Sequence, residues 1–331
     1  SRRIVTTCTL LISLLSSPLA FSADGRADYD LDNDGLIEIN DLADLDEIRN
    51  NLDGKTLYGS NVGCPNAEDG TVNGGCIGFE LTADLDFDTN QDSLMDSNDT
   101  YWNENNEGIG EGWLPLGGGG TQFKAIFEGN GYAINSLYIN RPSTNVIGLF
   151  GYINQAEIRN VVLTGQLMSI IGKSYIGSLV GLSRSSQISN SINTGPVIGS
   201  FRTGGLVGYL DSSQVSNSFN TGSVLGSTRD TGGLVGYVSS SKIWRSLSTG
   251  YVFGTPIVGG LIGSSRNSIS SSSYWAIDSS GQTFSAGQVE AYSYVGVTLA
   301  TLQCAINANT DSTNSNCVSS DGSTEGLNAA M

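Results

Sequence analysis

A short motif of glycine and aliphatic residues recurs through the C-terminal part of the chain. Its form is Gly-x-Leu-Val/Ile-Gly, and its copies end at Gly181, Gly208, Gly236 and Gly263, after a degenerate GLFG that ends at Gly151. The copies follow one another at an almost constant interval of roughly 28 residues, which indicates a repeat architecture.

Two further columns of residues keep the same period. One places an aliphatic residue six positions before a threonine, and the other places an aliphatic residue shortly after that threonine. Their members are Ile158 and Thr164, Ile188 and Thr194, Val215 and Thr221, Ile243 and Thr249, then Leu167, Val197, Val224 and Val252. The apolar steps are short, β-branched and separated by Gly, Ser and Asn, which favours strands over helices.

The repeat predicts an all-β solenoid with about three short strands per coil. A single coil cannot bury its apolar side, so neighbouring coils must stack, about 4.8 Å apart, to form a continuous core. The paired glycines would serve tight corners, where a side chain would clash with the coil above. A flexible Gly/Ser linker would not keep its aliphatic residues in register.

The N-terminal pattern is that of an export signal. Arg2 and Arg3 precede the apolar run IVTTCTLLISLLSSPLA, and Ala20-Phe21-Ser22 fits a small-x-small cleavage site. We expect residues 1–22 to be a signal peptide, so that the mature chain is secreted or displayed at the cell surface. No later stretch is apolar enough for a membrane span.

Charge is concentrated in one part of the chain. The net charge is −17, and residues 24–112 hold 23 of the 32 acidic residues. This balance argues against nucleic acid and anionic membranes as partners. Histidine is absent, which excludes Ser-His-Asp and Cys-His catalysis as well as His-ligated zinc.

Twelve residues at the start of the acidic region, DLDNDGLIEIND, have the spacing of a calcium-binding loop. Calcium prefers six to eight oxygen ligands, which such a loop supplies from positions 1, 3, 5, 7, 9 and 12. The predicted ligands are Asp30, Asp32, Asp34, the Leu36 carbonyl, Glu38 and Asp41. Gly35 falls at position 6, where the chain turns sharply, and Ile37 would point into the core. Leu42, Leu45, Ile48 and Leu52 predict a following helix that ends near Gly54.

A second copy, DTNQDSLMDSND, repeats this spacing. Its predicted ligands are Asp88, Asn90, Asp92, the Leu94 carbonyl, Asp96 and Asp99. Ser93 stands where glycine is usual, so a left-handed backbone there would cost about 1 kcal/mol. An Asp/Asn-rich solvated turn is the alternative for both loops.

Four cysteines remain after the signal peptide, which contains Cys8. We expect disulfides in an exported chain, with the local pairs Cys64–Cys76 and Cys304–Cys317 the simplest of three connectivities. Each pair would close a loop of roughly 13 residues. Metal binding by these cysteines is disfavoured, since there is no C-x-x-C and no histidine.

The quoted motifs resemble a known family. The GGLVG repeats look like those of GLUG-motif proteins, which are exported bacterial surface proteins and adhesins. FKAIFEGNGYAINSLYINR, residues 123–141, resembles the coil that leads into such repeats. The resemblance covers about residues 28–275 and implies a right-handed parallel β-helix. The motif also occurs in IgA-specific metallopeptidases, but their H-E-x-x-H zinc site is excluded here.

The two acidic loops resemble the dockerin type of calcium loop, in which Asp stands at position 12. Dockerins separate their loops by one helix, whereas here the cysteine loop and the strand-like FELTADLDF also lie between them. We therefore expect calcium to be structural. The expected organisation is a signal peptide (1–22), a calcium loop with its helix (23–58), a cap with the first coils, the cysteine loop and the second calcium loop (59–146), the repeat solenoid (147–275), and a C-terminal cap or truncated further module (276–331).

Three functions fit these features. The first is adhesion to glycans or another surface, through a column of aromatic residues that follow the motif: Tyr152, Tyr209 and Tyr237. We expect a monomer or part of a longer chain. The second is a carbohydrate-active β-helix enzyme, whose candidates are Glu128, Glu157, Asp211, Asp230, Lys124 and Arg202. The third is an ice- or surface-templating protein that uses Thr164, Thr194, Thr221 and Thr249. We predict the first function, and no enzymatic activity.

Overall fold

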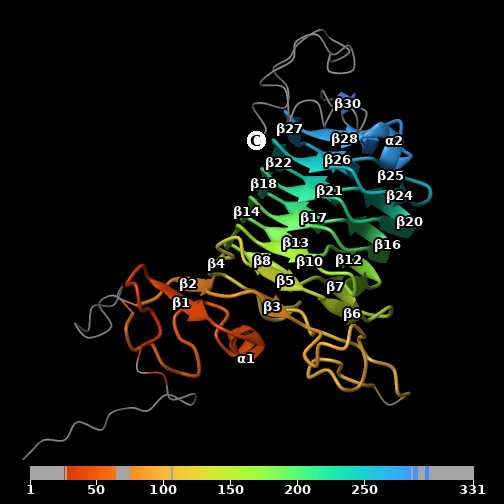
Figure 1. Cartoon of the computed structure of the whole chain (residues 1–331). Coiled ribbons are helices and arrows are strands. Elements are labelled where there is room, and N and C mark those ends of the chain that lie inside the picture. The colour runs from red at the N-terminus through yellow and green to blue at the C-terminus, as the bar shows by residue number, and fades with distance from the viewer. Residues whose placement is uncertain are drawn as a thin grey trace, which may run out of the picture.

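The fold is a parallel β-solenoid, which confirms the predicted fold class (Figure 1). The computed structural model describes residues 26, 28–64, 75–105, 107–284, 286–289 and 295–297. The predicted signal peptide and the Cys304–Cys317 pair lie outside these residues. Within the described part, no helix has the length and apolar character needed to cross a membrane.

Four sheets run along the solenoid, and the paired strands within them are parallel. The first sheet consists of β1 (Leu36–Ile39), β2 (Gly78–Leu81), β4 (Ile126–Glu128), β9 (Glu157–Arg159), β14 (Gln187–Ser189), β18 (Gln214–Ser216), β22 (Lys242–Trp244) and β27 (Ile269–Ser271). The second consists of β3 (Leu85–Asp86), β5 (Ala133–Asn135), β10 (Val162–Thr164), β15 (Ile192–Asn193), β19 (Phe219–Asn220), β23 (Leu247–Ser248), β28 (Tyr274–Ala276) and β30 (Val295–Val297).

The other two sheets close the coil. The third consists of β6 (Tyr138–Asn140), β7 (Asn145–Ile147), β11 (Ser169–Ile171), β12 (Ser174–Ile176), β16 (Val197–Gly204), β20 (Val224–Gly232), β24 (Val252–Phe253) and β25 (Val258–Gly259). The fourth consists of β8 (Phe150–Asn154), β13 (Val180–Arg184), β17 (Val207–Asp211), β21 (Val235–Ser239), β26 (Ile262–Arg266) and β29 (Ala286–Val289). A short helix, α2 (Ile277–Ser280), follows β28.

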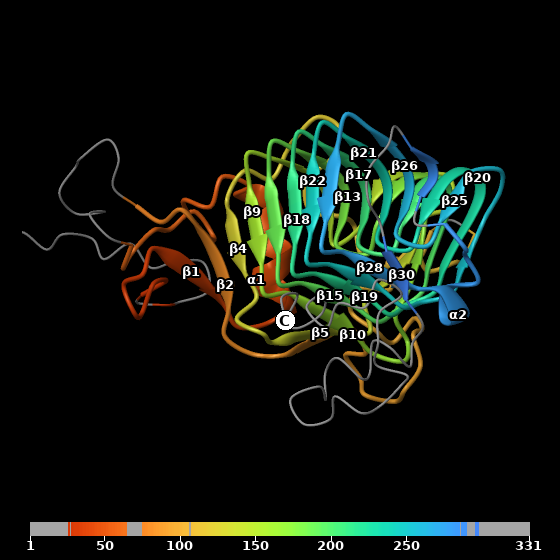
Figure 2. The ribbon, with the colours of Figure 1, turned by 90° about the horizontal axis from the view of Figure 1, so that it is seen from above.

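The chain visits the sheets in the order first, second, third, fourth, and then returns to the first. Seen from above, the strands of successive coils, such as β4, β9, β18 and β22, run side by side (Figure 2). The prediction of about three strands per coil was wrong, because each repeat coil has a strand in all four sheets. The sequence predicts tight corners at the paired glycines, and Gly204 and Gly205 do lie where β16 ends and the chain turns towards β17. The corner is only the first half of the Gly-x-Leu-Val-Gly motif, and Val207–Asp211 continues from it as a strand.

The strand register explains why the interval between motifs is not quite constant. In the third sheet, β16 and β20 pair Gly199 with Gly226 but Phe201 with Arg229, so that one extra residue is absorbed between these pairs. On the next coil the offset between partners becomes shorter by one within the same sheet, between Leu225↔Phe253 and Thr231↔Val258. Over these two coils the repeat therefore changes length at this bend. The longer interval that precedes them ends at another place, between Val162↔Ile192 in the second sheet and Ile170↔Val197 in the third.

The last glycine of each motif allows two sheets to approach closely. A Cβ on Gly208 would lie 2.4 Å from the backbone nitrogen of Ile176, and one on Gly236 would lie 2.6 Å from the carbonyl carbon of Arg202. The third-sheet backbone faces these glycines at a column of left-handed residues, which are Val146, Tyr175, Arg202 and Asp230. The clash that the glycines avoid is therefore with the facing sheet of the preceding coil.

Buried serines turn two corners of each coil from Ser186 onwards, whereas Ala156 and Val161 hold these places in the coil before. At the corner between the fourth and first sheets, the Ser213 hydroxyl donates to the Asp211 carbonyl and accepts from the Ser186 N–H at 3.1 Å. Ser186, Ser213, Ser241 and Ser268 form this ladder, and Ser191, Ser218, Ser246 and Ser273 form a second one between the first and second sheets. Each of these serines follows a residue with a left-handed backbone. The hydroxyls thereby satisfy N–H groups that the tight turn leaves without a strand partner.

The acidic N-terminal segment is part of the solenoid. Strand β1 pairs with β2 and forms the end of the first sheet. Helix α1 (Leu42–Glu47) and the 3-10 turn η1 (Ile48–Asn50) follow, and they bury Leu42, Leu45 and Ile48 as predicted. The helix ends earlier than predicted, before Gly54. Ile37 is fully buried, also as predicted.

A long excursion between β3 and β4 carries the second acidic loop (Figure 1). It packs against α1 through an aromatic cluster, in which the rings of Phe87 and Trp113 lie 5.4 Å apart and those of Tyr101 and Trp113 lie 5.5 Å apart. The Tyr101 hydroxyl donates to the Leu42 carbonyl at 2.9 Å. The two acidic loops are thus joined by one core.

Candidate functional site

The two acidic loops have the same backbone hydrogen-bond scheme. In the first, Asp30 accepts from the N–H groups of Asp34 and Gly35, both at 3.0 Å. In the second, Asp88 accepts from the N–H groups of Asp92 at 3.2 Å and Ser93 at 3.0 Å. The next positions also agree, since the side chain at position 3 accepts from the N–H of position 5, and the side chain at position 5 accepts from the N–H of position 7. These side chains are Asp32 and Asp34 in the first loop, and Asn90 and Asp92 in the second.

The left-handed positions of the loops also coincide. Gly35 has a φ of 91° and Ser93 has a φ of 66°, so the serine does adopt the backbone that favours glycine. Position 4 is left-handed in both loops, at Asn33 and Gln91. Two stretches that lie far apart in the sequence therefore fold alike over their first seven positions, which two unrelated solvated turns would not be expected to do.

The loops differ in the carboxylate that closes them. In the second loop, Asp99 at position 12 is 4% exposed and accepts from the N–H groups of Thr89 and Asp96. In the first loop, the carboxylate that accepts from the N–H of position 2 is Glu38 at position 9, which accepts from the Leu31 N–H at 2.6 Å. Asp41, the predicted ligand at position 12, instead caps α1 by accepting from the N–H groups of Ala43 and Asp44.

The remaining predicted ligands lie at the edges of the loops. Leu36 is the first residue of β1, so its carbonyl belongs to the backbone that leaves the first loop. Leu94 is 57% exposed. The Asp96 side chain accepts from the Asn98 N–H at 2.8 Å and caps the turn that follows the second loop.

The first loop faces a carboxylate that sequence reasoning missed. Glu80 of β2 lies opposite Glu38 in the strand register, and one carboxylate oxygen from each of Asp32, Glu38 and Glu80 lies within 4.8 Å of the other two. Burial raises the pKa of Glu38, with smaller contributions from the charges of Asp30 and Asp32. Burial likewise raises the pKa of Glu80, and the nearby charges of the loop add to this.

The Cys64–Cys76 disulfide is present, which confirms the predicted pairing of these two cysteines. The Sγ atom of Cys76 lies 3.7 Å from Oδ2 of Asp30. Because both sulfurs are in the disulfide, neither can act as a thiolate ligand. The bridge instead buttresses the first acidic residue of the loop.

The predicted column of surface tyrosines is only partly formed. Tyr209 and Tyr237 are neighbours in the fourth sheet, with ring centroids 5.3 Å apart, and both are partly exposed. The prediction was wrong for Tyr152, which is 7% exposed and is separated from Tyr209 by Leu182 in the register. A segment outside the repeat pairs with the fourth sheet on either side of this tyrosine, through the bridges of Leu116 to Phe150 and of Phe123 to Ile153.

Arg202 joins the two exposed tyrosines into one patch with two third-sheet aromatics. Its guanidinium carbon lies 4.1 Å from the ring centroid of Tyr237 and 4.6 Å from that of Tyr209. It lies 5.3 Å from the ring centroid of Tyr175 and 4.8 Å from that of Phe201. We call Tyr175, Phe201, Arg202, Tyr209 and Tyr237 the aromatic–arginine patch. The tyrosines that follow the motif, Tyr209 and Tyr237, could be found from the repeat. Their partners on the third sheet, Tyr175 and Phe201, belong to no repeated pattern in the sequence.

The four carboxylates considered for catalysis are all paired with arginines. Glu128 and Glu157 both pair with Arg159, and Asp211 pairs with Arg184 at 3.0 Å. Asp230 is 1% exposed and lies between Arg202 and Arg229. Such pairing suits carboxylates that hold adjacent coils together. Lys124 lies apart from them and lines a shallow surface hollow beside η1.

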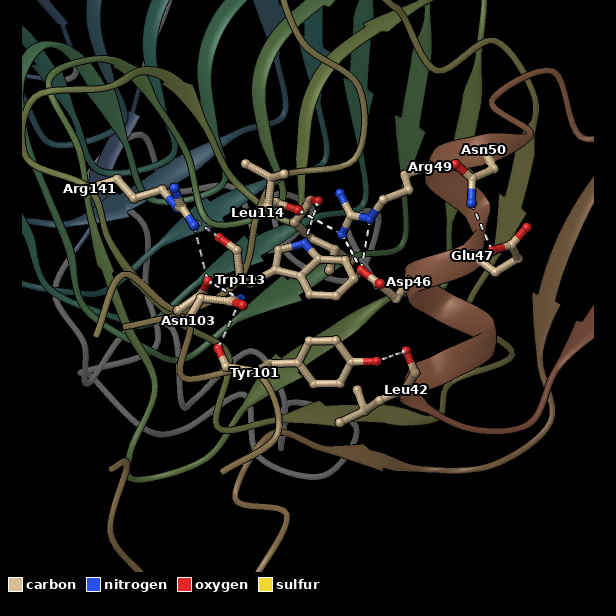
Figure 3. Close-up of polar contacts among 12 residues, drawn as sticks. Leu42, Asp46, Glu47, Arg49, Asn50, Tyr101, Asn103, Trp113, Leu114 and Arg141 are labelled. Carbon is tan, nitrogen blue, oxygen red and sulfur yellow. Dashed lines mark hydrogen bonds and ion pairs between the residues drawn. The ribbon is translucent and has the colours of Figure 1, made fainter. Parts of the chain in front are cut away.

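A cleft of about 410 Å³ lies between the helical segment and the excursion (Figure 3). Arg49 pairs with Asp46, donates to the Leu114 carbonyl at 3.2 Å and lies 4.9 Å from the ring centroid of Trp113. Arg141 pairs with Glu111 at 2.6 Å, and burial lowers the pKa of this arginine. Trp113 is fully buried and offers no exposed ring surface. The two arginines of the cleft already have partners in Asp46, the Leu114 carbonyl and Glu111.

The threonine column lies at the surface edge of the second sheet. The Thr194 hydroxyl donates to that of Thr164 at 3.1 Å, and Thr194 and Thr221 are exposed. One threonine per coil gives a single row.

Comparisons with known proteins identify the repeat. Residues 199–225 match the family model of the GLUG motif, which confirms the predicted resemblance over one coil. A "Putative Gly-rich membrane protein" of Evansella cellulosilytica is 40% identical over 74 residues, which are 22% of this chain and 9% of that protein. "Halomucin" of Haloquadratum walsbyi is 33% identical over 118 residues, 35% of this chain and 1% of that protein.

The chain therefore spans less than a tenth of the length of each of these two relatives. Among solved structures, one described as "a putative immunoglobulin A1 protease from Bacteroides ovatus" aligns with a TM-score of 0.44 and 17% identity. The alignment covers 79% of this chain and 68% of that one.

Proposed function

We propose that this chain is an extracellular or cell-surface recognition module, in which a rigid solenoid presents the aromatic–arginine patch to a glycan. The observation that carries the proposal is the contact of Arg202 with four aromatic rings on neighbouring coils. Aromatic faces suit the apolar faces of sugar rings, and a guanidinium adds hydrogen-bond donors beside them. The relatives named as a membrane protein and a halomucin support a surface location.

The test is a binding panel of soluble glycans and insoluble polysaccharides with wild type and two tyrosine variants. Tyr237→Ala removes a ring of the patch, whereas Tyr251→Ala removes a tyrosine that is 51% exposed and lies just before β24, outside the patch. We expect Tyr237→Ala to weaken binding at least tenfold and Tyr251→Ala to leave it unchanged. Equal binding by both variants, or no ligand in the panel, would contradict the proposal.

We also propose that calcium stabilises the N-terminal end through the two acidic loops. The support is their shared backbone scheme, together with oxygen ligands at the spacing that calcium requires. Oε2 of Glu38 is buried and accepts no hydrogen bond within the described part of the chain, as expected of an oxygen that faces a cation. Calcium would then shield the repulsion among these carboxylates.

Thermal unfolding with calcium and with excess chelator tests this role. If calcium binds only the folded chain, a concentration of 100 times Kd stabilises it by about 2.7 kcal/mol. For a chain of this size, that corresponds to a rise in Tm of roughly 5–10 °C. We expect Asp34→Ala to remove part of the rise. An unchanged Tm up to millimolar calcium would refute the role.

A further inference from the structure

A column of side chains crosses the first sheet at the N-terminal end. The register pairs Glu38 of β1 with Glu80 of β2, Glu80 with Glu128 of β4, and Glu128 with Arg159 of β9. The three glutamates are 5%, 8% and 6% exposed, respectively. Three buried carboxylates thus stand on successive strands about 4.8 Å apart, and a buried carboxylate is costly unless it is paired and hydrogen-bonded.

Within the described residues, only the last glutamate of the column pairs with a positive charge. Glu128 pairs with Arg159 and accepts two hydrogen bonds from the Asn160 side chain. Glu80 accepts from the uncharged Asn130 side chain at 2.7 Å. The ion pairs formed among the described residues include neither Glu38 nor Glu80.

The two unneutralised glutamates meet the first acidic loop. Their carboxylate oxygens and one from Asp32 lie within 4.8 Å of one another. They are therefore close enough to share one calcium ion, because two ligands at about 2.4 Å from it lie at most about that far apart. Oε1 of Glu38 is engaged by the Leu31 N–H. Its Oε2 is buried and has no partner within the described residues.

We propose that Glu80 is a ligand of the cation held by the first loop, together with Asp32 and Glu38. This inference rests on the proposed calcium role. It assigns to β2 the carboxylate that the loop lacks, because Asp41 at position 12 caps α1. Calcium would then bridge β1 to the next strand of the sheet, which follows only after α1 and the cysteine loop in the sequence. Asn130 extends the connection, since it contacts both Glu80 and the Leu81 carbonyl.

Three variants of the full chain test the inference by calcium titration calorimetry and thermal unfolding. Glu80→Gln keeps the shape and an acceptor for Asn130 but removes the charge. Glu128→Gln is the matched control, because it lies in the same column but is paired with Arg159. Asp34→Asn removes a predicted ligand of the loop itself.

We expect Glu80→Gln to weaken calcium binding at the first loop at least tenfold. In chelator its Tm should equal or exceed that of wild type, because one repelling charge is gone, and in calcium it should fall below wild type. Glu128→Gln should leave calcium affinity unchanged and lower Tm equally in both conditions. This crossing of Tm values is the signature of a ligand, since a purely structural glutamate would shift Tm in one direction only.

The possible failures are distinguishable. If wild type binds calcium and Asp34→Asn loses one equivalent while Glu80→Gln retains wild-type affinity and stoichiometry, the assignment of Glu80 is wrong and the calcium role stands. If Glu80→Gln loses a separate equivalent that Asp34→Asn retains, the shared site is wrong. If wild type binds no calcium, both the role and the assignment fail.

Discussion

Gly236 offers a direct test of why the motif requires glycine. A Cβ at this position would lie 2.6 Å from the carbonyl carbon of Arg202 and 2.7 Å from the Thr203 nitrogen and the Gly208 oxygen. All three are backbone atoms, so no flexible side chain can move aside. Gly236 does not have a left-handed φ, and the effect of an added methyl group is therefore steric.

The expected cost of Gly236→Ala is about 3 kcal/mol, the upper end of the range for overpacking a well-packed core. For a chain of this size each kcal/mol lowers Tm by about 2–4 °C, so we expect a fall of roughly 6–12 °C. Thermal unfolding followed by circular dichroism measures it. Gly119→Ala is the matched control, because its Cβ would have no heavy atom within 4 Å. Equal Tm values for the two variants would refute the close-approach explanation.

Three further predictions concern the corners, the disulfide and the aromatic cluster. Ser218→Ala removes a hydroxyl that accepts from the Ser191 N–H and donates to the Ser216 carbonyl, so we expect a loss of about 1–3 kcal/mol in urea unfolding; no loss would show that the serine ladders are dispensable. Replacing Cys64 and Cys76 by serine should lower stability by about 3 kcal/mol and weaken calcium binding at the first loop, measured by calorimetry. Burial raises the pKa of Tyr101 to about 12; because the folded state keeps the proton that the unfolded state loses near pH 10, stability should fall as pH rises from 10 to 12, and Tyr101→Phe should remove that part of the pH dependence.

The repeat was predictable because stacking demands it. Residues one coil apart must meet, so the period of the sequence motif appears directly in the strand register, with Gln187, Gln214 and Lys242 paired in turn. The number of strands per coil was not predictable in the same way. Half-buried steps of two or three residues, such as Ile192–Asn193, are too short for alternation to reveal them.

The acidic loops show where local spacing stops being informative. The two twelve-residue stretches place their predicted ligands at the same positions, yet the residues at position 12 have different roles. Asp41 caps α1, whereas Asp99 accepts hydrogen bonds within the second loop. Asp41 directly precedes an apolar helical pattern, and this arrangement is also that of an N-cap. Glu80 could not be found from spacing, because only the pairing of β1 with β2 brings it to Glu38. The prediction that Tyr152 lies at the surface was wrong for a related reason. The segment that pairs beside this tyrosine lies outside the repeat, so the repeat pattern could not reveal it.

The bend in the third sheet that absorbs one residue has an evolutionary consequence. Between Gly199 and Phe201, and again on the next coil, the chain changes length while the strands before and after the bend stay paired with their neighbours. Insertions and deletions at this bend would escape the selection that preserves the core. Arg202 and Asp230 lie close beside it, so the surface that distinguishes one coil from the next can diversify there while duplicated coils remain interchangeable as building units.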